Sequence, residues 1–193
     1  MIKAVIFDFF GVLVSEGFKV FCDTHFAGEP EKRRLATEAV NRHDAGQTTA
    51  DEFYDELSKL AGIEYGVAQA LNTNQPNKPL LDYIRYILKD KYKLGVLSNS
   101  GDDYITKLLK PEDVELFDDI VLSYRYKIVK PQPEIYELAL NRLGCLAHEV
   151  ILVDDSPRHA TGARDAGMQA ILYVGFPSMK DELEKILSAG TGG

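Results

Sequence analysis

Five short apolar stretches, each rich in β-branched residues, constrain the fold of this sequence more than any other feature. They run through residues 3–7, 94–98, 119–123, 150–154 and 170–174. Most are hydrophobic at nearly every position, which is typical of strands buried on both faces of a parallel sheet. Helical patterns separate the last four stretches, with Pro133 and Gly144 marking a helix start and a helix end. The alternation predicts an α/β fold with a doubly wound, parallel, Rossmann-like sheet of about five strands.

The interval after the first predicted strand departs from this alternation. Between residues 15 and 91 the apolar side chains follow helical spacing, and Pro30 and Pro79 mark helix starts. We therefore predict a helical cap domain over residues 15–91, inserted into a core domain of residues 1–14 and 92–193. The cap would lie at the carboxyl end of the sheet, where open α/β folds bind their ligands.

Side chains suited to chemistry stand at or just after the ends of four predicted strands. They are Asp8, the pair Ser98 and Asn99, Lys130, and the pair Asp154 and Asp155. Because the carboxyl ends of parallel strands meet at one edge of a sheet, we expect these side chains to share a site. Hydroxyl, amide and ammonium groups stabilise anionic oxygens, and paired carboxylates suit Mg²⁺. The set predicts a phosphoryl-transfer site in which the first aspartate is the nucleophile.

The order and spacing of these residues resemble the four signatures of the haloacid dehalogenase superfamily over residues 2–187. Within that superfamily the chain is most similar to the small-cap hydrolases related to the phosphatase domain of soluble epoxide hydrolase. The resemblance implies that Asp8 is the nucleophile and forms an aspartyl-phosphate. It also implies that Ser98, Asn99 and Lys130 bind the phosphoryl group, with the lysine counted among the catalytic residues.

The metal site and one departure from the family pattern follow from the same resemblance. It implies a Mg²⁺ cofactor held by Asp8, Asp154, Asp155 and the backbone carbonyl of Phe10. In most phosphatases of this family the place of Phe10 holds a second aspartate, which protonates the leaving oxygen and then activates the hydrolytic water. Such general acid–base catalysis contributes about 10²–10⁴-fold to rate, and a phenyl ring cannot supply it.

Three functions are compatible with this departure. The first, which we predict, is a Mg²⁺-dependent phosphatase acting on a small phosphorylated metabolite, with solvent or another group moving the proton. The second is a 2-haloacid dehalogenase, because halide leaves without a proton and that branch carries an aromatic residue at this place. The third is a non-catalytic protein that binds a ligand or partner. Lys130 and the acidic pair Asp154 and Asp155 favour the first function, because attack on carbon needs no metal and two acids repel an anionic substrate.

Composition limits the partners that we expect. The net charge of -8 disfavours nucleic acid, which selects basic surfaces. No apolar run approaches the roughly 18 residues of a membrane-spanning helix, and a basic start with a signal-peptide cleavage site is missing. We therefore expect a cytoplasmic enzyme without membrane or nucleic-acid partners, as a monomer or a homodimer. The four histidines show no metal-ligand spacing, and His159 is considered only as a substrate contact.

Overall fold

A single parallel sheet forms the centre of the structure, a computed structural model that describes residues 1–66 and 74–189. Its strand order is β3-β2-β1-β4-β5, and every neighbouring pair runs parallel. The strands are β1 (Ala4–Phe7), β2 (Lys93–Ser98), β3 (Asp119–Leu122), β4 (Val150–Asp154) and β5 (Gln169–Leu172). The predicted α/β sheet is confirmed, and each strand boundary lies within two residues of the expected one. After β1 the chain builds one side of the sheet and then the other, so the topological switch point lies beside β1.

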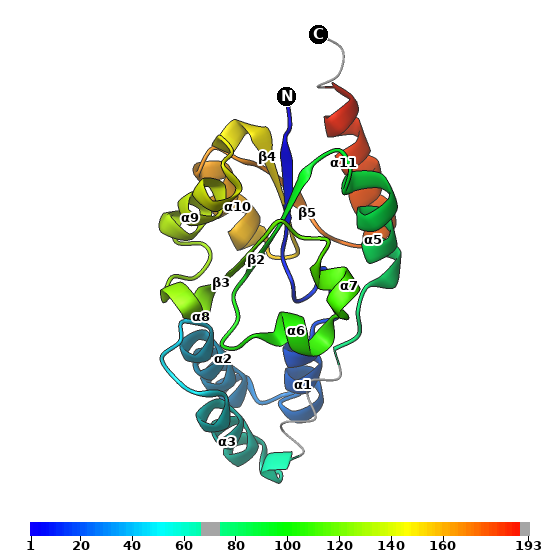
Figure 1. The fold of residues 1–193 in the computed structure, drawn as a ribbon. Coiled ribbons are helices and arrows are strands. Elements are labelled where there is room, and N and C mark those ends of the chain that lie inside the picture. The colour runs from blue at the N-terminus through cyan, green and yellow to red at the C-terminus, as the bar shows by residue number, and fades with distance from the viewer. Residues whose placement is uncertain (67–73, 190–193) are drawn as a thin grey trace.

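Helices cover both faces of the sheet (Figure 1). One face carries α9 (Pro133–Leu143) and α10 (Pro157–Asp165); the other carries α5 (Lys78–Tyr83), the π-helical turn η1 (Ile84–Leu88) and α11 (Phe176–Ala189). Alternate residues of β1 enter the two cores, Ile6 on the first face and Phe7 on the second. Burying each of these side chains contributes about 1.5–3 kcal/mol, so β1 is held firmly and its carboxyl end is a fixed platform.

Short elements fill the loops at the ends of the strands. They are α6 (Tyr104–Leu108), α7 (Pro111–Val114), α8 (Ser123–Tyr126) and the 3-10 turn η2 (Ala147–Glu149). The first of them follows β2 and α8 follows β3 directly, so both lie near the carboxyl edge of the sheet (Figure 1). Among the described residues, no helix combines the length and the apolarity needed to cross a membrane.

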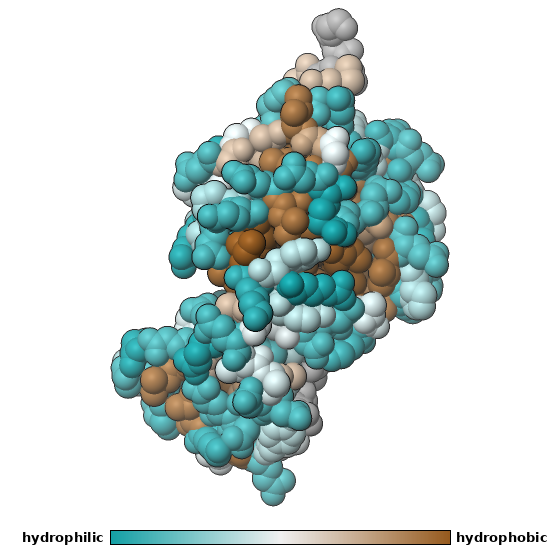
Figure 2. All heavy atoms as spheres, turned by 60° about the vertical axis from the view of Figure 1, so that its left-hand side comes forward, coloured by the Kyte–Doolittle hydropathy of each residue, from teal (hydrophilic) through white to brown (hydrophobic). Residues whose placement is uncertain are grey.

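Within the described part of the chain, three helices form a separate layer that faces the carboxyl ends of the strands (Figure 1). They are α1 (Gly17–His25), α2 (Pro30–Asp44) and α3 (Ala50–Ala61). These helices pack around their own small core, in which Phe21, Phe26 and Leu57 are almost completely buried. Thr49 and Glu52 close a capping box at the start of α3. Figure 2 shows this layer as a smaller lobe joined to the core through a narrower waist.

The packing of α5 and η1 bears on where the cap ends. Leu80, Ile84 and Leu88 are buried in the same apolar cluster as the residues of β1 and β2, and not with the three cap helices. At the junction, the chain entering the cap pairs with the chain leaving it through a bridge between Val14 and Pro76. We therefore propose a cap that ends at this crossing, with α5 and η1 belonging to the core.

Candidate active site

Asp8 lies just beyond the end of β1, at the centre of the carboxyl edge. It is only 6% exposed, and its Oδ1 accepts a hydrogen bond of 2.7 Å from the Phe9 backbone N–H. The chain then turns sharply at Gly11, whose φ of +81° is one that residues with a side chain rarely adopt. A Cβ at this glycine would lie 2.2 Å from the Asp155 carboxylate. The absence of a side chain at Gly11 therefore allows the turn after Asp8 to lie against Asp155.

Lys130 joins two of the predicted acids. Its Nζ lies 2.8 Å from Asp8 Oδ1 and 2.6 Å from Asp154 Oδ2, and its side chain is completely buried. Burial alone would lower the pKa of Lys130, but the two carboxylates raise it above its usual range, so the ammonium stays charged. Asn99 fixes the lysine backbone, because its amide accepts from Lys130 N–H at 2.7 Å and donates to the Lys130 carbonyl at 3.1 Å.

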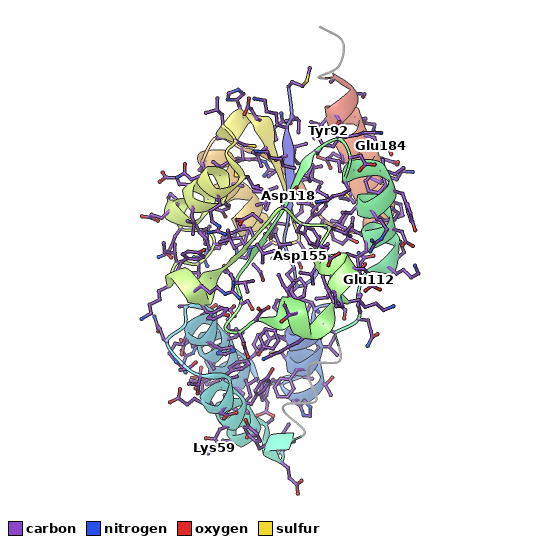
Figure 3. All side chains as sticks on the ribbon, viewed as in Figure 1. Lys59, Tyr92, Glu112, Asp118, Asp155 and Glu184 are labelled. Atoms are coloured by element: carbon purple, nitrogen blue, oxygen red, sulfur yellow. The ribbon has the colours of Figure 1, made fainter. Side chains whose placement is uncertain are left out.

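The two acids after β4 have different surroundings. Asp154 is fully buried, and its second oxygen accepts from the Ser156 backbone N–H at 2.9 Å and from His159 Nδ1 at 3.1 Å. Burial would raise the pKa of Asp154, but Lys130 and His159 hold it well below its usual range. The pKa of Asp155 is instead raised, by burial and by the charge of Asp154. In Figure 3 Asp155 lies at the end of the sheet that faces the cap.

Ser98 and Asn99 also differ in placement. The Ser98 side chain is fully buried, and its hydroxyl donates to the Asn99 carbonyl at 3.3 Å. Asn99 lines a cavity together with Asp8 and Asp155, whereas Ser98 does not line it. The roles of Ser98 and Asn99 in phosphate binding therefore stay predictions.

The donor set at this edge fits a divalent cation. Asp8, Asp154 and His159 each place one potential ligand atom within 4.8 Å of the others. The carboxylates of Asp8 and Asp154 contact the Lys130 ammonium, and the Asp155 carboxylate adds negative charge close to them. Burial raises the pKa of Asp8 to about 8. A hard cation would neutralise this excess negative charge and would favour the ionised aspartates.

The individual ligands of the predicted metal site are proposals. Asp8, Phe10 and Asp155 line the cavity, whereas both oxygens of Asp154 already accept hydrogen bonds within the protein. Asp155 is therefore the more available of the paired acids. His159 was not predicted as a ligand, and only its position next to the acidic pair in the sequence could have indicated it.

A cavity of about 340 Å³ lies between the core and the cap. Its floor includes Asp8 and Asp155, and its cap wall combines aromatic side chains such as Phe53 with the acids Glu16 and Asp44. Sequence reasoning did not identify these two acids, because a charged residue in an amphipathic helical segment is ordinarily solvated. They become visible only when the cap is placed over the sheet.

Comparison with known families identifies the class of protein. The sequence profile of the haloacid dehalogenase-like hydrolases matches residues 2–167 of the 193-residue chain. The protein belongs to this family and is a hydrolase of the haloacid dehalogenase superfamily, as its signatures and its Rossmann-like sheet indicate.

Individual relatives sharpen this placement. The chain is 29% identical to bifunctional epoxide hydrolase 2 of Mus musculus over 150 residues, which cover 70% of this chain and 27% of that protein. It thus spans about a quarter of the length of that curated relative. It is 25% identical to D-ribitol-5-phosphate phosphatase of Bacteroides thetaiotaomicron over 98% of this chain and the whole of that protein.

A solved structure with bound ions resembles this fold. The family enzyme bt-2542 of Bacteroides thetaiotaomicron, in complex with magnesium and inorganic phosphate, superposes with a TM-score of 0.69 at 26% identity. The superposition covers 89% of this chain and 93% of that one.

Proposed function

We propose that this protein is a Mg²⁺-dependent phosphatase that hydrolyses a small phosphorylated metabolite through an aspartyl-phosphate on Asp8. The observation that carries the proposal is the placement of the Asp8 carboxylate on the floor of the cavity, 2.8 Å from Lys130 Nζ. The relative named as a D-ribitol-5-phosphate phosphatase and the bt-2542 complex with magnesium and phosphate support it.

The chemistry follows from the placement of the charges. The Asp8 carboxylate attacks phosphorus, and the leaving oxygen departs on the opposite side. Lys130 and the Asn99 amide stabilise the negative charge that the transferred oxygens carry. Mg²⁺ held by Asp8, Asp155, Asp154 and the Phe10 carbonyl would neutralise further negative charge when bound. Water then attacks the aspartyl-phosphate and regenerates the free carboxylate.

Asp154 has a supporting role in this proposal. Its carboxylate binds Lys130 on one oxygen and His159 on the other, so it fixes the lysine beside the nucleophile. Removing Asp154 would therefore act through the position and the charge of Lys130 as well as through any metal.

The second candidate function is a 2-haloacid dehalogenase, and Phe10 is the observation that favours it. The Phe10 side chain lines the cavity and packs edge-to-face on Tyr104, with ring centroids 5.7 Å apart. However, Asp155 lines the same cavity beside Asp8, and attack of a carboxylate on carbon has no need of a second acid that can bind a metal. A divalent cation bound by these oxygens would offset their charge and attract a phosphoryl group, so the donor set favours the phosphatase. A non-catalytic binding protein is disfavoured because it would have no need for a buried nucleophile paired with a lysine.

One panel assay separates the three functions. Release of inorganic phosphate from acetyl phosphate, para-nitrophenyl phosphate and ribitol 5-phosphate is measured beside release of halide from 2-chloropropionate, with Mg²⁺ or with EDTA. We expect phosphate release that requires Mg²⁺. Halide release in EDTA would establish the dehalogenase instead, and no release from any compound would favour a binding protein.

A further inference from the structure

One acid in the cavity has no part in the mechanism above. Asp44 is the last residue of α2, and it lines the same cavity as Asp8 and Phe10. The carboxyl end of a helix carries partial negative charge, so an ionised acid is disfavoured there. Burial acts in the same direction and raises the pKa of Asp44 to about 7. An acid held against both effects in a ligand cavity is characteristic of a functional group.

The backbone of Asp44 is tied directly to the core. Its carbonyl accepts a hydrogen bond of 2.5 Å from the Ser123 hydroxyl, and the same hydroxyl accepts from the Ser100 backbone N–H at 2.9 Å. Ser100 lies two residues beyond Ser98, and Ser123 begins α8 directly after β3. The end of α2 is therefore fixed to the carboxyl ends of β2 and β3, beside the predicted phosphate site.

Side chains beside Asp44 connect it to the place of the missing aspartate. His43 lies against Gly101, and its Nε2 is 3.5 Å from the Tyr104 hydroxyl. The ring of Tyr104 in turn packs edge-to-face on Phe10. A continuous set of contacts therefore joins the end of α2 to the residue that replaces the usual proton carrier.

We propose that Asp44 performs the two proton transfers that a second aspartate performs in related phosphatases. The inference rests on the proposed phosphatase function and names the acid–base group that Phe10 cannot be. In the first step the Asp8 oxygen–phosphorus bond forms, the bond from phosphorus to the leaving oxygen breaks, and that oxygen takes the proton of the Asp44 carboxylic acid. In the second step the Asp44 carboxylate accepts a proton from the attacking water, phosphate departs, and Asp8 is regenerated.

The groups around Asp44 set the expected pH dependence. The positive charge of Lys130 lowers the pKa of Asp44, and the negative charge of Glu16 raises it. Burial lowers the pKa of His43 and raises the pKa of Tyr104. Both of these neighbouring side chains are therefore neutral near pH 7. The first step needs the protonated acid, which is the form present below the pKa. We therefore expect kcat/KM for alkyl phosphates to fall as the pH rises above about 7.

The test compares leaving groups in wild-type protein and Asp44→Asn. For an alkyl phosphate such as ribitol 5-phosphate, we expect kcat/KM to fall by about 10²-fold or more. For para-nitrophenyl phosphate, whose leaving group departs without a proton, kcat/KM should change little. The matched control is Asp55→Asn, which changes an exposed acid on α3 outside the cavity and should leave both rates unchanged.

A rescue variant and the wild-type rates keep the outcomes distinct. Introducing Phe10→Asp into the Asp44→Asn protein should restore turnover of the alkyl phosphate. An unchanged kcat/KM for para-nitrophenyl phosphate reports that the Asp8 site remains folded. Because hydrolysis of the aspartyl-phosphate is common to both substrates, the comparison is made in kcat/KM. If wild-type protein releases phosphate but Asp44→Asn lowers kcat/KM equally for both substrates, or for neither, the role of Asp44 is refuted alone. If wild-type protein releases no phosphate from either substrate, the proposed function falls and this inference falls with it.

Discussion

The floor and the cap wall of the cavity both contain acids, but they hold these acids differently. On the floor, Lys130 bridges Asp8 and Asp154 through contacts of 2.8 and 2.6 Å, so opposite charges offset each other inside the core. On the wall, Glu16 and Asp44 face the same cavity, and burial raises the pKa of both. The floor thus holds two of its acids against a buried ammonium, whereas burial is the main influence on the pKa of the two acids of the wall.

The two regions also differ in how the chain assembles them. The floor consists of strand ends from one parallel sheet, whose register brings Asp8 and Asp154 side by side. The wall depends on the docking of α2 against loops that lie far from it in the sequence, as in the hydrogen bond from Ser123 to the Asp44 carbonyl. The proposed nucleophile and its lysine therefore follow from the topology of the sheet, whereas the acids of the wall follow from the placement of the cap.

The largest effect is expected on the floor, from Asp8→Asn. An amide cannot form an aspartyl-phosphate, so phosphate release should fall by about 10⁴-fold or more. The fold should persist, because the substitution replaces a buried carboxylate whose ionised form burial disfavours. Phosphate release measures the loss of turnover, and thermal unfolding followed by circular dichroism checks that the fold persists. A variant with wild-type turnover would exclude Asp8 as the nucleophile and would remove the functional distinction between floor and wall.

Much of the floor could be predicted from the sequence. The predicted strands 3–7, 94–98 and 150–154 end in or run directly into polar residues, and parallel strands must bring those ends to one edge. Asp8, Lys130 and Asp154 are accordingly joined by direct contacts. The spacing of residues does not predict the geometry within a motif. It could therefore not show that Asp154 is hydrogen-bonded within the protein while Asp155 is more available to a ligand.

The wall could not be predicted, for a physical reason. Helical periodicity shows which face of a segment is apolar, but not what a helix end will touch. Asp44 is the last residue of a polar helix, and its carbonyl is bound by Ser123, far along the chain, which Ser100 binds in turn. For the same reason the packing of Leu80 and Leu88 on the sheet could not be predicted, because an apolar helix face does not specify which hydrophobic core it joins.

The next effect concerns the charge balance of the floor, which Lys130→Met would break. Methionine keeps the side-chain volume but leaves Asp8 and Asp154 uncompensated, so we expect a loss of about 3–5 kcal/mol in the free energy of unfolding. Lys130 holds the pKa of Asp154 below its unfolded value, so its stabilisation is present at neutral pH and is lost as the pH falls. The deficit of the variant should therefore persist down to about pH 4, the ordinary pKa of an aspartate, and narrow below it, as measured by urea unfolding.

Lys59→Met is the matched control for this variant. Lys59 pairs with Asp55 at 2.6 Å on the outer part of the cap, with a side chain that is 75% exposed (Figure 3). Surface ion pairs of this kind contribute little, so the control should unfold like wild-type protein at every pH. Equal stability of the two variants would mean that the buried bridge does not hold the floor together.

The smallest effect is expected where the wall docks on the core, from Gly101→Ala. The added Cβ would lie 2.3 Å from the His43 ring, so the end of α2 must move away. Overpacking of this kind costs about 1–3 kcal/mol in the free energy of unfolding. Because Asp44 follows His43, turnover of an alkyl phosphate should decline more than turnover of para-nitrophenyl phosphate.

Gly66→Ala provides the comparison for Gly101→Ala, because no described atom lies within 4 Å of the Cβ it would add. Its stability and both rates should match wild-type protein, as followed by urea unfolding and phosphate release. If Gly101→Ala loses stability but slows both substrates equally, the end of α2 supports the cap without selecting the leaving group. A selective loss on the alkyl phosphate would instead tie the position of this helix end to proton transfer, so that a wall residue would complete chemistry that the floor alone cannot perform.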